Sequence, residues 1–206
     1  MKKGFILTSF VLLAFTFSSF DVIKLKAPDV NGGKTLLSAM KSRRSDRVFQ
    51  NKALSEKHLS ELMWAAYGVN REDGKRTVPS ARAMYPLRIY AVTQNGIYLY
   101  NPQKHVLEPV KEGDYRKYCG TQPFVATAPL NIVIVSDYSR LGTMNDQQKA
   151  VYSALDAAHC CQNVYLYCAS EGLKVVERAM VNDKELIKQI GLDSNFHFVI
   201  AQTVGY

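Results

Sequence analysis

The stretch LNIVIVS, residues 130–136, is dominated by β-branched and other aliphatic side chains. A continuous apolar run of this length is typical of a β-strand that is buried on both faces, because a strand with one exposed face alternates apolar and polar residues. We therefore predict a strand here that lies in the interior of the protein.

More strands are predicted on either side of this run. Leu87–Thr93 is rich in β-branched and aromatic residues, and Gln94-Asn95-Gly96, which follows it, contains the strongest short signal for a hairpin turn. The hairpin predicts a return strand over Ile97–Tyr100. The other predicted strands are a third strand of the meander near Val106–Val110, and Leu173–Glu177 and Phe196–Val204.

Helical spacing of apolar residues marks four segments: Leu36–Lys41, Ser55–Tyr67, Asn145–Glu171 and Asp183–Ile190. The third is the longest and is apolar nearly all round at its centre, so we expect it inside the protein or at a subunit interface. Its predicted core stripe is Val151, Leu155, Ala158, Cys161 or Gln162, and Tyr165. Strands and helices are mixed without regular βαβ alternation, which predicts one domain of the α+β class.

The N-terminus has the pattern of a secretory signal peptide. Lys2 and Lys3 precede an apolar run over Phe5–Phe15, and small polar residues follow it. We predict a signal peptide over residues 1–18, a linker or extended arm over 19–34, and the folded domain over 35–206. The protein would then be exported, with the periplasm as its expected location. The alternative is an uncleaved anchor, although the run is shorter than a membrane-spanning helix.

The chain has 206 residues and a formal net charge of +8, which falls to +6 without Lys2 and Lys3. A basic surface attracts phosphate, anionic cofactors or nucleic acid, or its charge is simply dispersed for solubility. The densest basic cluster is Lys41, Arg43, Arg44 and Arg47. It is too short for an extended nucleic-acid track, so we expect no nucleic acid partner.

Several kinds of site are excluded by the pattern of residues. The chain has no GxSxG, HExxH, GxxxxGK[ST] or GxGxxG motif, and its four histidines lie in separate segments without the spacing of a metal site. We therefore predict no metal site and no side-chain nucleophile. The cysteines Cys119, Cys160, Cys161 and Cys168 form no paired framework, and buried free thiols are expected.

Four local features could carry chemistry. SRRSDR, residues 42–47, groups three arginines that suit bidentate contact with a phosphate. PSARAMYP, residues 79–86, places small residues between two prolines, where a backbone can approach a flat ring. SEGL, residues 170–173, ends the long helix at a glycine, and QPFVATAPLNIVIVSD, residues 122–137, leads from a loop into the buried strand. Taken singly, each is equally consistent with an ordinary turn or cap.

Taken in order, these motifs resemble the nitroreductase family of flavoproteins, and in particular its SagB-type oxidoreductase branch. The resemblance covers roughly Thr35 to Tyr206. Its markers are RRSDRVF, SEKHLSELMWAAYGVNR, PSARAMYPLRIYAV, GIYLYNPQKHVLEPV, ATAPLNIVIVSD, DAAHCCQNVYLYCASEGL and the terminal TVGY.

The resemblance implies an antiparallel-dominated central sheet surrounded by helices, and FMN held noncovalently at the interface of a homodimer. The resemblance implies that Arg43, Arg44 and Ser45 contact the phosphate, ribityl chain or pyrimidine edge of FMN, and that Arg47 adds positive charge. Pro79, Ser80 and Ala81 of the partner chain would line the isoalloxazine ring. Glu171, Gly172 and Leu173 would approach the central ring of the flavin. The branch commonly has glycine where this chain has Arg82, and this arginine would either add a phosphate contact or obstruct the substrate side of the ring.

The implied activity is that of an FMN-dependent oxidoreductase. It would transfer a hydride or electrons from a donor, NAD(P)H being one candidate, to a small organic acceptor in a ping-pong cycle. Such chemistry belongs to the flavin and needs no catalytic side chain. Because NAD(P)H is mainly cytoplasmic, export favours a different electron donor, or an oxidase that uses oxygen as its electron acceptor. The alternatives are a noncatalytic flavin- or ligand-binding homodimer on the same fold and a structural dimer without cofactor.

Overall fold

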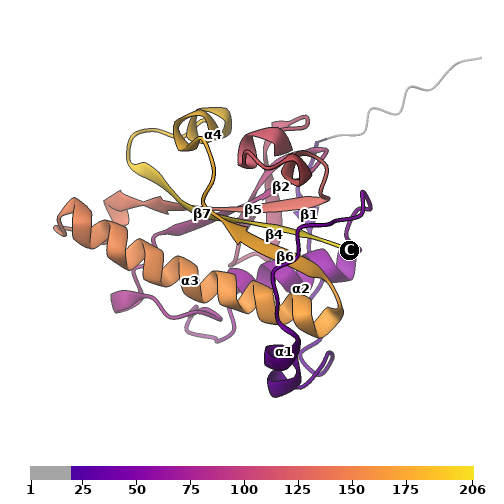
Figure 1. The fold of residues 1–206 in the computed structure, drawn as a ribbon. Helices are drawn as coiled ribbons and strands as arrows, with labels where there is room; N and C mark the ends of the chain where they lie inside the picture. The colour runs from indigo at the N-terminus through magenta and orange to yellow at the C-terminus, as the bar shows by residue number, and fades with distance from the viewer. Residues whose placement is uncertain (1–19) are drawn as a thin grey trace, which may run out of the picture.

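The computed structural model describes residues 20–206, so the predicted signal peptide lies outside the described residues (Figure 1). Seven strands form one antiparallel sheet in the order β1-β4-β3-β2-β5-β7-β6. The strands are β1 (Ile23–Lys24), β2 (Leu87–Val92), β3 (Gly96–Asn101), β4 (Val106–Glu112), β5 (Leu130–Asp137), β6 (Lys174–Arg178) and β7 (Phe196–Gly205).

Helices cover both faces of the sheet, which confirms the predicted α+β class with an antiparallel sheet (Figure 1). The α-helices are α1 (Leu36–Ser42), α2 (Glu56–Tyr67), α3 (Asp146–Glu171) and α4 (Asp183–Ile190), and the short 3₁₀ helices are η1 (Ala81–Ala83), η2 (Arg116–Cys119), η3 (Pro123–Ala126) and η4 (Tyr138–Leu141). On one face α2 and α3 pack on the sheet, and α4 packs on the other face with η2 and η3.

The strand predicted from LNIVIVS is the centre of this arrangement. It forms β5, which pairs with β2 on one side and β7 on the other, and all of its residues are buried. Its successive side chains alternate between the two cores, since Ile132 and Ile134 lie in the core under α3 while Val133 and Val135 lie in the core under α4. A strand with two buried faces therefore has no position for exposed polar residues.

Substitution of Ile132 by alanine is expected to lower the free energy of unfolding by about 2–5 kcal/mol, because this fully buried side chain would leave a cavity in close-packed surroundings. Urea denaturation followed by circular dichroism measures this change. Val30→Ala is the control, since Val30 is exposed, and we expect it to change stability by less than about 0.5 kcal/mol. Equal effects of both substitutions would contradict this packing.

Helix α3 begins at a capping box, in which the Asn145 side chain accepts from the Gln148 N–H and the Gln148 side chain accepts from the Asn145 N–H. The predicted core stripe of this helix is wrong in part. Val151 and Leu155 are exposed, and the buried side carries small residues such as Ala157 and Cys160. Small side chains face α2 and the sheet because they allow the helix to approach closely, so the bulkier aliphatic residues remain outside.

The segment before α1 is extended, as expected, but it is not separate from the domain. Ile23 and Lys24 pair with Val106 and Leu107 of β4 as an edge strand, and the Phe20 ring lies 4.9 Å from the Tyr98 ring. Within residues 20–34 this segment therefore lies along the sheet as an extended arm, and its N-terminal part pairs with β4. A strand of two residues is too short to show alternation in the sequence.

The four cysteines are buried and free, which confirms the prediction of buried thiols. Burial raises the pKa of Cys119 to about 12, and it raises the pKa of the other three thiols as well. Thiols that stay protonated at neutral pH are poor nucleophiles.

None of the helices within residues 20–206 is both long and apolar enough to cross a membrane.

Candidate functional site at the end of the long helix

The C-terminal end of α3 brings two of the predicted site segments together. The helix ends because Gly172 takes a left-handed conformation, with φ of +74°, and its N–H donates to the Cys168 carbonyl. Leu173 N–H donates to the same carbonyl, and β6 begins at the next residue. The turn SEGL is thus a tight link from the helix into an edge strand of the sheet.

The segment SRRSDR leaves α1 and runs along this edge strand. Asp46 N–H donates to the Val175 carbonyl at 2.9 Å, and the Tyr165 hydroxyl of α3 lies 2.8 Å from the Ser45 hydroxyl. The same tyrosine accepts a hydrogen bond from Glu177 N–H, and its ring lies 5.2 Å from the Arg43 guanidinium carbon. Tyr165 therefore holds the arginine-rich segment against both α3 and β6.

Tyr165→Phe is expected to lower the free energy of unfolding by about 1–3 kcal/mol, because it leaves the Glu177 N–H and the Ser45 hydroxyl without their shared partner. We also expect the Asp46 amide to exchange its hydrogen faster, which native-state hydrogen exchange measures. Tyr152→Phe is the matched control, since Tyr152 lies exposed on the same helix. Unchanged protection at Asp46 would show that Tyr165 does not hold this segment.

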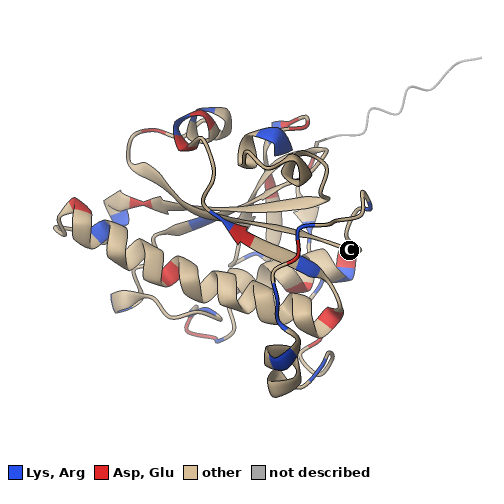
Figure 2. Cartoon of the chain, viewed as in Figure 1, with Lys and Arg blue, Asp and Glu red and all other residues tan. Residues whose placement is uncertain are grey.

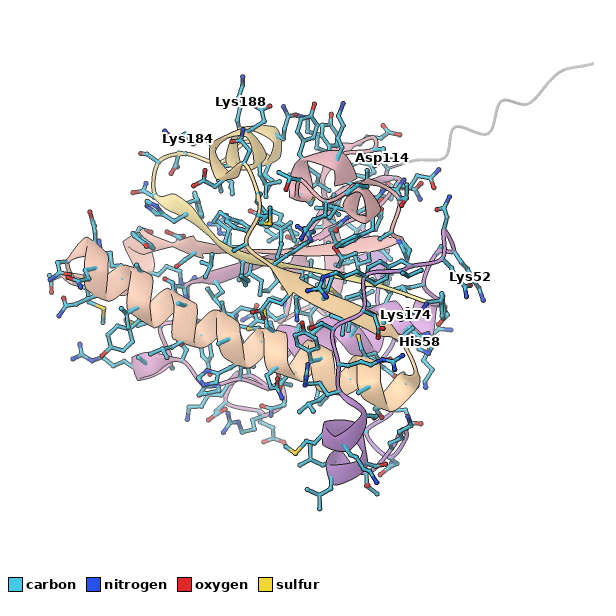
Figure 3. The ribbon with its side chains drawn as sticks, in the orientation of Figure 1. Lys52, His58, Asp114, Lys174, Lys184 and Lys188 are labelled. Atoms are coloured by element: carbon cyan, nitrogen blue, oxygen red, sulfur yellow. The ribbon has the colours of Figure 1, made fainter. Side chains whose placement is uncertain are left out.

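A polar cavity of about 250 Å³ lies between these segments. Three cationic side chains, Lys34, Arg44 and Lys174, line it together with one carboxylate, Asp46, which pairs with the Arg44 Nε at 3.1 Å. Figure 2 shows basic residues along the segment that follows α1, and Figure 3 places Lys174 beside the end of α3. The other lining residues are Ser42, Tyr165, Cys168, Ala169, Gly172, Leu173 and Val175.

Gly172 presents bare backbone to this cavity. A side-chain carbon added at this glycine would meet no atom within 4 Å, so the space beside it is open. The Lys34 ammonium donates to the Ala169 carbonyl at 3.1 Å, and Lys34 N–H donates to the Ser170 hydroxyl. A flat ligand with an anionic group could therefore approach the glycine backbone while its charge meets the lysine and arginine side chains.

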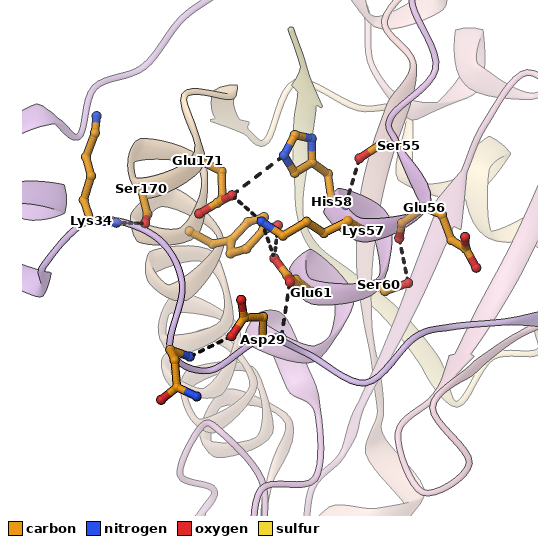
Figure 4. A network of polar contacts seen from close by, with 12 residues as sticks. Asp29, Lys34, Ser55, Glu56, Lys57, His58, Ser60, Glu61, Ser170 and Glu171 are labelled. Atoms are coloured by element: carbon orange, nitrogen blue, oxygen red, sulfur yellow. Dashed lines mark hydrogen bonds and ion pairs between the residues drawn. The ribbon is translucent and has the colours of Figure 1, made fainter.

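The Glu171 carboxylate belongs to a network beside the cavity (Figure 4). It accepts a hydrogen bond from the Lys57 ammonium at 2.9 Å, and it lies 3.8 Å from His58 Nε2. The same lysine lies 3.6 Å from Glu61, which accepts a hydrogen bond from the Tyr167 hydroxyl. The hydrogen bond that Lys57 donates to Glu171 raises the pKa of Lys57. This network ties α2 to the last turn of α3.

The third predicted segment, PSARAMYP, lies beside the middle of α3, where it contacts Asp156. The Ser80 hydroxyl donates to the buried Asp156 carboxylate at 2.6 Å and accepts a hydrogen bond from Tyr85 N–H. Arg82 and Tyr85 both have positive φ, 52° and 45°, which side chains rarely adopt outside functional or strained turns. The loop is therefore held in one unusual conformation by α3.

A single chain does not bring all the predicted contacts together. Asp156, which holds the loop, and Glu171 lie on the same helix, and a rise of about 1.5 Å per residue puts them about 22 Å apart. Of the predicted residues, Arg44, Gly172 and Leu173 line the cavity. Arg43, Ser45, Arg47 and Glu171 belong to the segments that flank it, whereas Pro79, Ser80, Ala81 and Arg82 belong to the loop that contacts Asp156, farther back along the helix.

Sequence patterns missed three residues of the cavity. Lys34 lies in the segment predicted as a linker, and Lys174 was expected only as part of a strand. Tyr165 was predicted as a core residue, and its ring is indeed buried while its hydroxyl organises the site. A basic residue two positions after the helix-ending Gly172 is the one signal that could have indicated Lys174.

Comparison with known proteins agrees with this geometry. A candidate nitroreductase of Methanocaldococcus jannaschii is 32% identical over 176 residues, which cover 81% of this chain and 88% of the relative. The crystal structure of a candidate nitroreductase from Ralstonia eutropha has a TM-score of 0.85 and 36% identity, and the match covers 98% of this chain and 95% of that one. The NADPH:FMN oxidoreductase from Vibrio harveyi in complex with NAD⁺ has a TM-score of 0.62 at 18% identity, over 84% of this chain and 69% of that one, and shows likeness of fold.

The sequence profile of the nitroreductase family matches residues 40–206, which include both segments around the cavity and the loop that contacts Asp156. The profile and the curated relative each extend over most of the chain. With an antiparallel sheet between helical layers and an open glycine at the end of its long helix, this chain belongs to the nitroreductase family.

Proposed function

We propose that the protein is an FMN-dependent oxidoreductase that works as a homodimer. One observation carries the proposal: cationic side chains and the bare backbone of Gly172 line the same open cavity at the end of α3. The family places the protein among oxidoreductases, and the Vibrio harveyi relative in fold is an FMN oxidoreductase by its name. The motifs around Arg43, Ser80 and Gly172 also support assignment to the SagB-type branch.

The residues of the cavity fit FMN in their chemistry. Arg44, Lys34 and Lys174 supply donors for a phosphate dianion, and arginine can contact a phosphate with two parallel hydrogen bonds. Gly172 leaves room for a ring at the helix end, where a larger residue would fill the space. Asp46 keeps Arg44 beside the cavity by its ion pair. In this role the chain's residues bind and orient the cofactor.

The cavity is smaller than the roughly 300–1,000 Å³ of typical ligand pockets, which supports a site completed by a second copy. The proposed second wall is the loop from Pro79 to Arg82 of the partner chain. Exposed apolar side chains are available for such an association: Leu37 is 77% exposed and Leu155 is 53% exposed. Others on α1 and α3, two helices that contact each other, are Leu36, Met40, Val151 and Tyr152. Apolar surface of this kind marks protein interfaces.

FMN, when bound, would supply hydride and electron transfer from a donor such as NAD(P)H to a small organic acceptor in alternating half-reactions. The test is anaerobic addition of NADH or NADPH to the FMN-loaded protein. We expect loss of the visible flavin absorption, and its return when an acceptor such as a quinone or nitroaromatic compound is added. Flavin that dithionite reduces but no donor or substrate affects would contradict the proposed activity.

Noncatalytic binding of flavin by a homodimer is the second candidate function, and Arg82 is the observation that favours it. This residue is exposed at positive φ, at the position where the branch commonly has glycine. In the proposed dimer its side chain would stand on the substrate side of the ring. Arg82→Gly distinguishes the two functions, because an obstructed but competent enzyme gains turnover in this variant, whereas a noncatalytic binder stays inert.

Export to the periplasm is also part of the proposal, based on the sequence of residues 1–18. Mass spectrometry of the protein from a periplasmic extract should find a chain shortened at about residue 18. A full-length chain confined to the cytoplasm would contradict it. Export would also favour a donor other than NAD(P)H.

A further inference from the structure

Arg76 is a buried arginine whose charge has no acceptor. Its exposed fraction is only 8%, and it lies in the loop between α2 and β2, away from the cavity at the end of α3. Its backbone N–H donates to the Tyr85 hydroxyl and its carbonyl accepts from Arg71. Its side chain, in contrast, makes no hydrogen bond or ion pair with any residue in 20–206, and its Nε is fully buried.

The groups around the Arg76 guanidinium are aromatic rings. Its central carbon lies 4.0 Å from the centre of the Tyr67 ring and 4.5 Å from that of Tyr85, and the planes of the two rings are inclined at 78°. The rings form a corner that attracts a cation through its π faces but offers no lone pair to the N–H groups. The buried Tyr67 hydroxyl also lacks an acceptor within the described chain.

The other two buried arginines show how this protein ordinarily satisfies such a group. Arg178 donates to Thr203, Asn131 and the Cys119 carbonyl. Arg116 pairs with the Asp114 carboxylate and donates to two carbonyls. A buried guanidinium without acceptors is costly, so the exception at Arg76 needs a physical reason.

A cavity of about 180 Å³ opens beside Arg76, between its loop and strands β2 and β3. Arg88 and Arg140 also line this cavity, with Tyr67, Tyr85 and Tyr100. Arg88 pairs with Asp137 at 3.4 Å, while Arg140 uses its Nε to bind the Met84 carbonyl and has no carboxylate partner in the described chain. The carboxylate in the lining is Glu108, which accepts a hydrogen bond from the Asn101 amide.

We propose that this cavity binds a small oxyanion, a carboxylate or a phosphate group, with Arg76 as its central ligand. The oxyanion would accept hydrogen bonds from the Arg76 guanidinium and the Tyr67 hydroxyl, and Arg140 would add charge at the rim. Since Arg140 donates to the Met84 carbonyl of the loop over residues 79–86 and Tyr85 belongs to that loop, a bound anion would also hold the loop in place. Nothing in this site depends on FMN.

The test measures the melting temperature of the protein, without flavin, in increasing inorganic phosphate or succinate, with sodium chloride at equal ionic strength as the reference. We expect a saturable rise with at least one of the two anions. Because binding to the folded state stabilises it by mass action, the rise gives the affinity. A rise with phosphate alone indicates a phosphorylated ligand, and a rise with succinate alone indicates an organic acid.

Two variants, with Arg44→Ala as their control, assign the rise in melting temperature to this cavity. Arg76→Met removes the buried charge and keeps an apolar chain of similar length, so we expect it to fold at least as stably in chloride and to lose the response to anions. Arg140→Ala changes an exposed side chain and should weaken binding about tenfold, the effect of about 1.4 kcal/mol. Arg44→Ala should keep the response, since it alters only the cavity at the end of α3.

Three results would overturn the proposal. One is the absence of any rise beyond that in chloride. The second is a full response in Arg76→Met, which would place the anion elsewhere. The third is a response that Arg44→Ala abolishes and Arg140→Ala leaves unchanged, which would assign the anion to the cavity at the end of α3. If Arg76→Met does not fold, Arg140→Ala and Arg44→Ala decide between the two cavities.

Discussion

Replacement of Arg43 and Arg44 together by alanine is expected to weaken FMN binding by about 100-fold or more. Arg44 lines the cavity and Arg43 lies over the Tyr165 ring beside it. A hydrogen bond to a charged group contributes about 1.5–3 kcal/mol, and each 1.4 kcal/mol is a factor of ten in affinity. Fluorescence titration of FMN measures the dissociation constant.

Lys188→Ala is the matched control for this loss. It removes one positive charge from α4, on the other face of the sheet, and we expect FMN affinity to change less than twofold. Equal weakening by this control would indicate a general electrostatic effect. Retention of full affinity in the double variant, with the fold intact, would show that the FMN phosphate does not bind in this cavity.

Substitution of Leu155 by aspartate is expected to give a monomer that does not retain FMN. Leu155 is exposed at the middle of α3 and stands with Val151 and Tyr152 on the proposed dimer surface. A carboxylate buried there without a partner costs several kcal/mol, which exceeds what a moderate interface can supply. The single chain should stay folded, because the substituted side chain is outside its core. Analytical ultracentrifugation measures the association state.

The control for this prediction is Lys184→Asp, which places a carboxylate on α4. It should leave both the association state and FMN binding unchanged. If Leu155→Asp dissociates the dimer while each monomer still binds one FMN tightly, the site is complete within one chain. If the variant remains a dimer, the interface lies on another surface.

The sequence was informative where one physical requirement dominates. The residues of β5 had to be apolar on both faces because each face meets a core, and their composition revealed the strand. The hairpin between β2 and β3 and the start of the helix predicted over Ser55–Tyr67 depend on local chemistry, so they too were predicted correctly. The buried face of α3 was predicted wrongly, because close packing selected Ala157 and Cys160 over the more hydrophobic Leu155.

The candidate site depended on contacts that no local pattern encodes. Arg44 and Gly172 are far apart in the chain, and the resemblance rather than the spacing of residues placed them at one site. The contribution of Lys34 follows from how the N-terminal segment docks on the end of α3. Arg76 gave no signal at all, since a lone arginine in a charged loop does not reveal that aromatic rings enclose it.

The most direct test of an FMN site shared between two copies is sedimentation velocity of the FMN-incubated protein, recorded at the protein and flavin absorption bands. The proposed site predicts that flavin sediments with a dimer at about one FMN per chain, and that Leu155→Asp removes both the dimer and the sedimenting flavin. Flavin that sediments with a monomer, or a dimer that carries none after incubation with excess FMN, would contradict it.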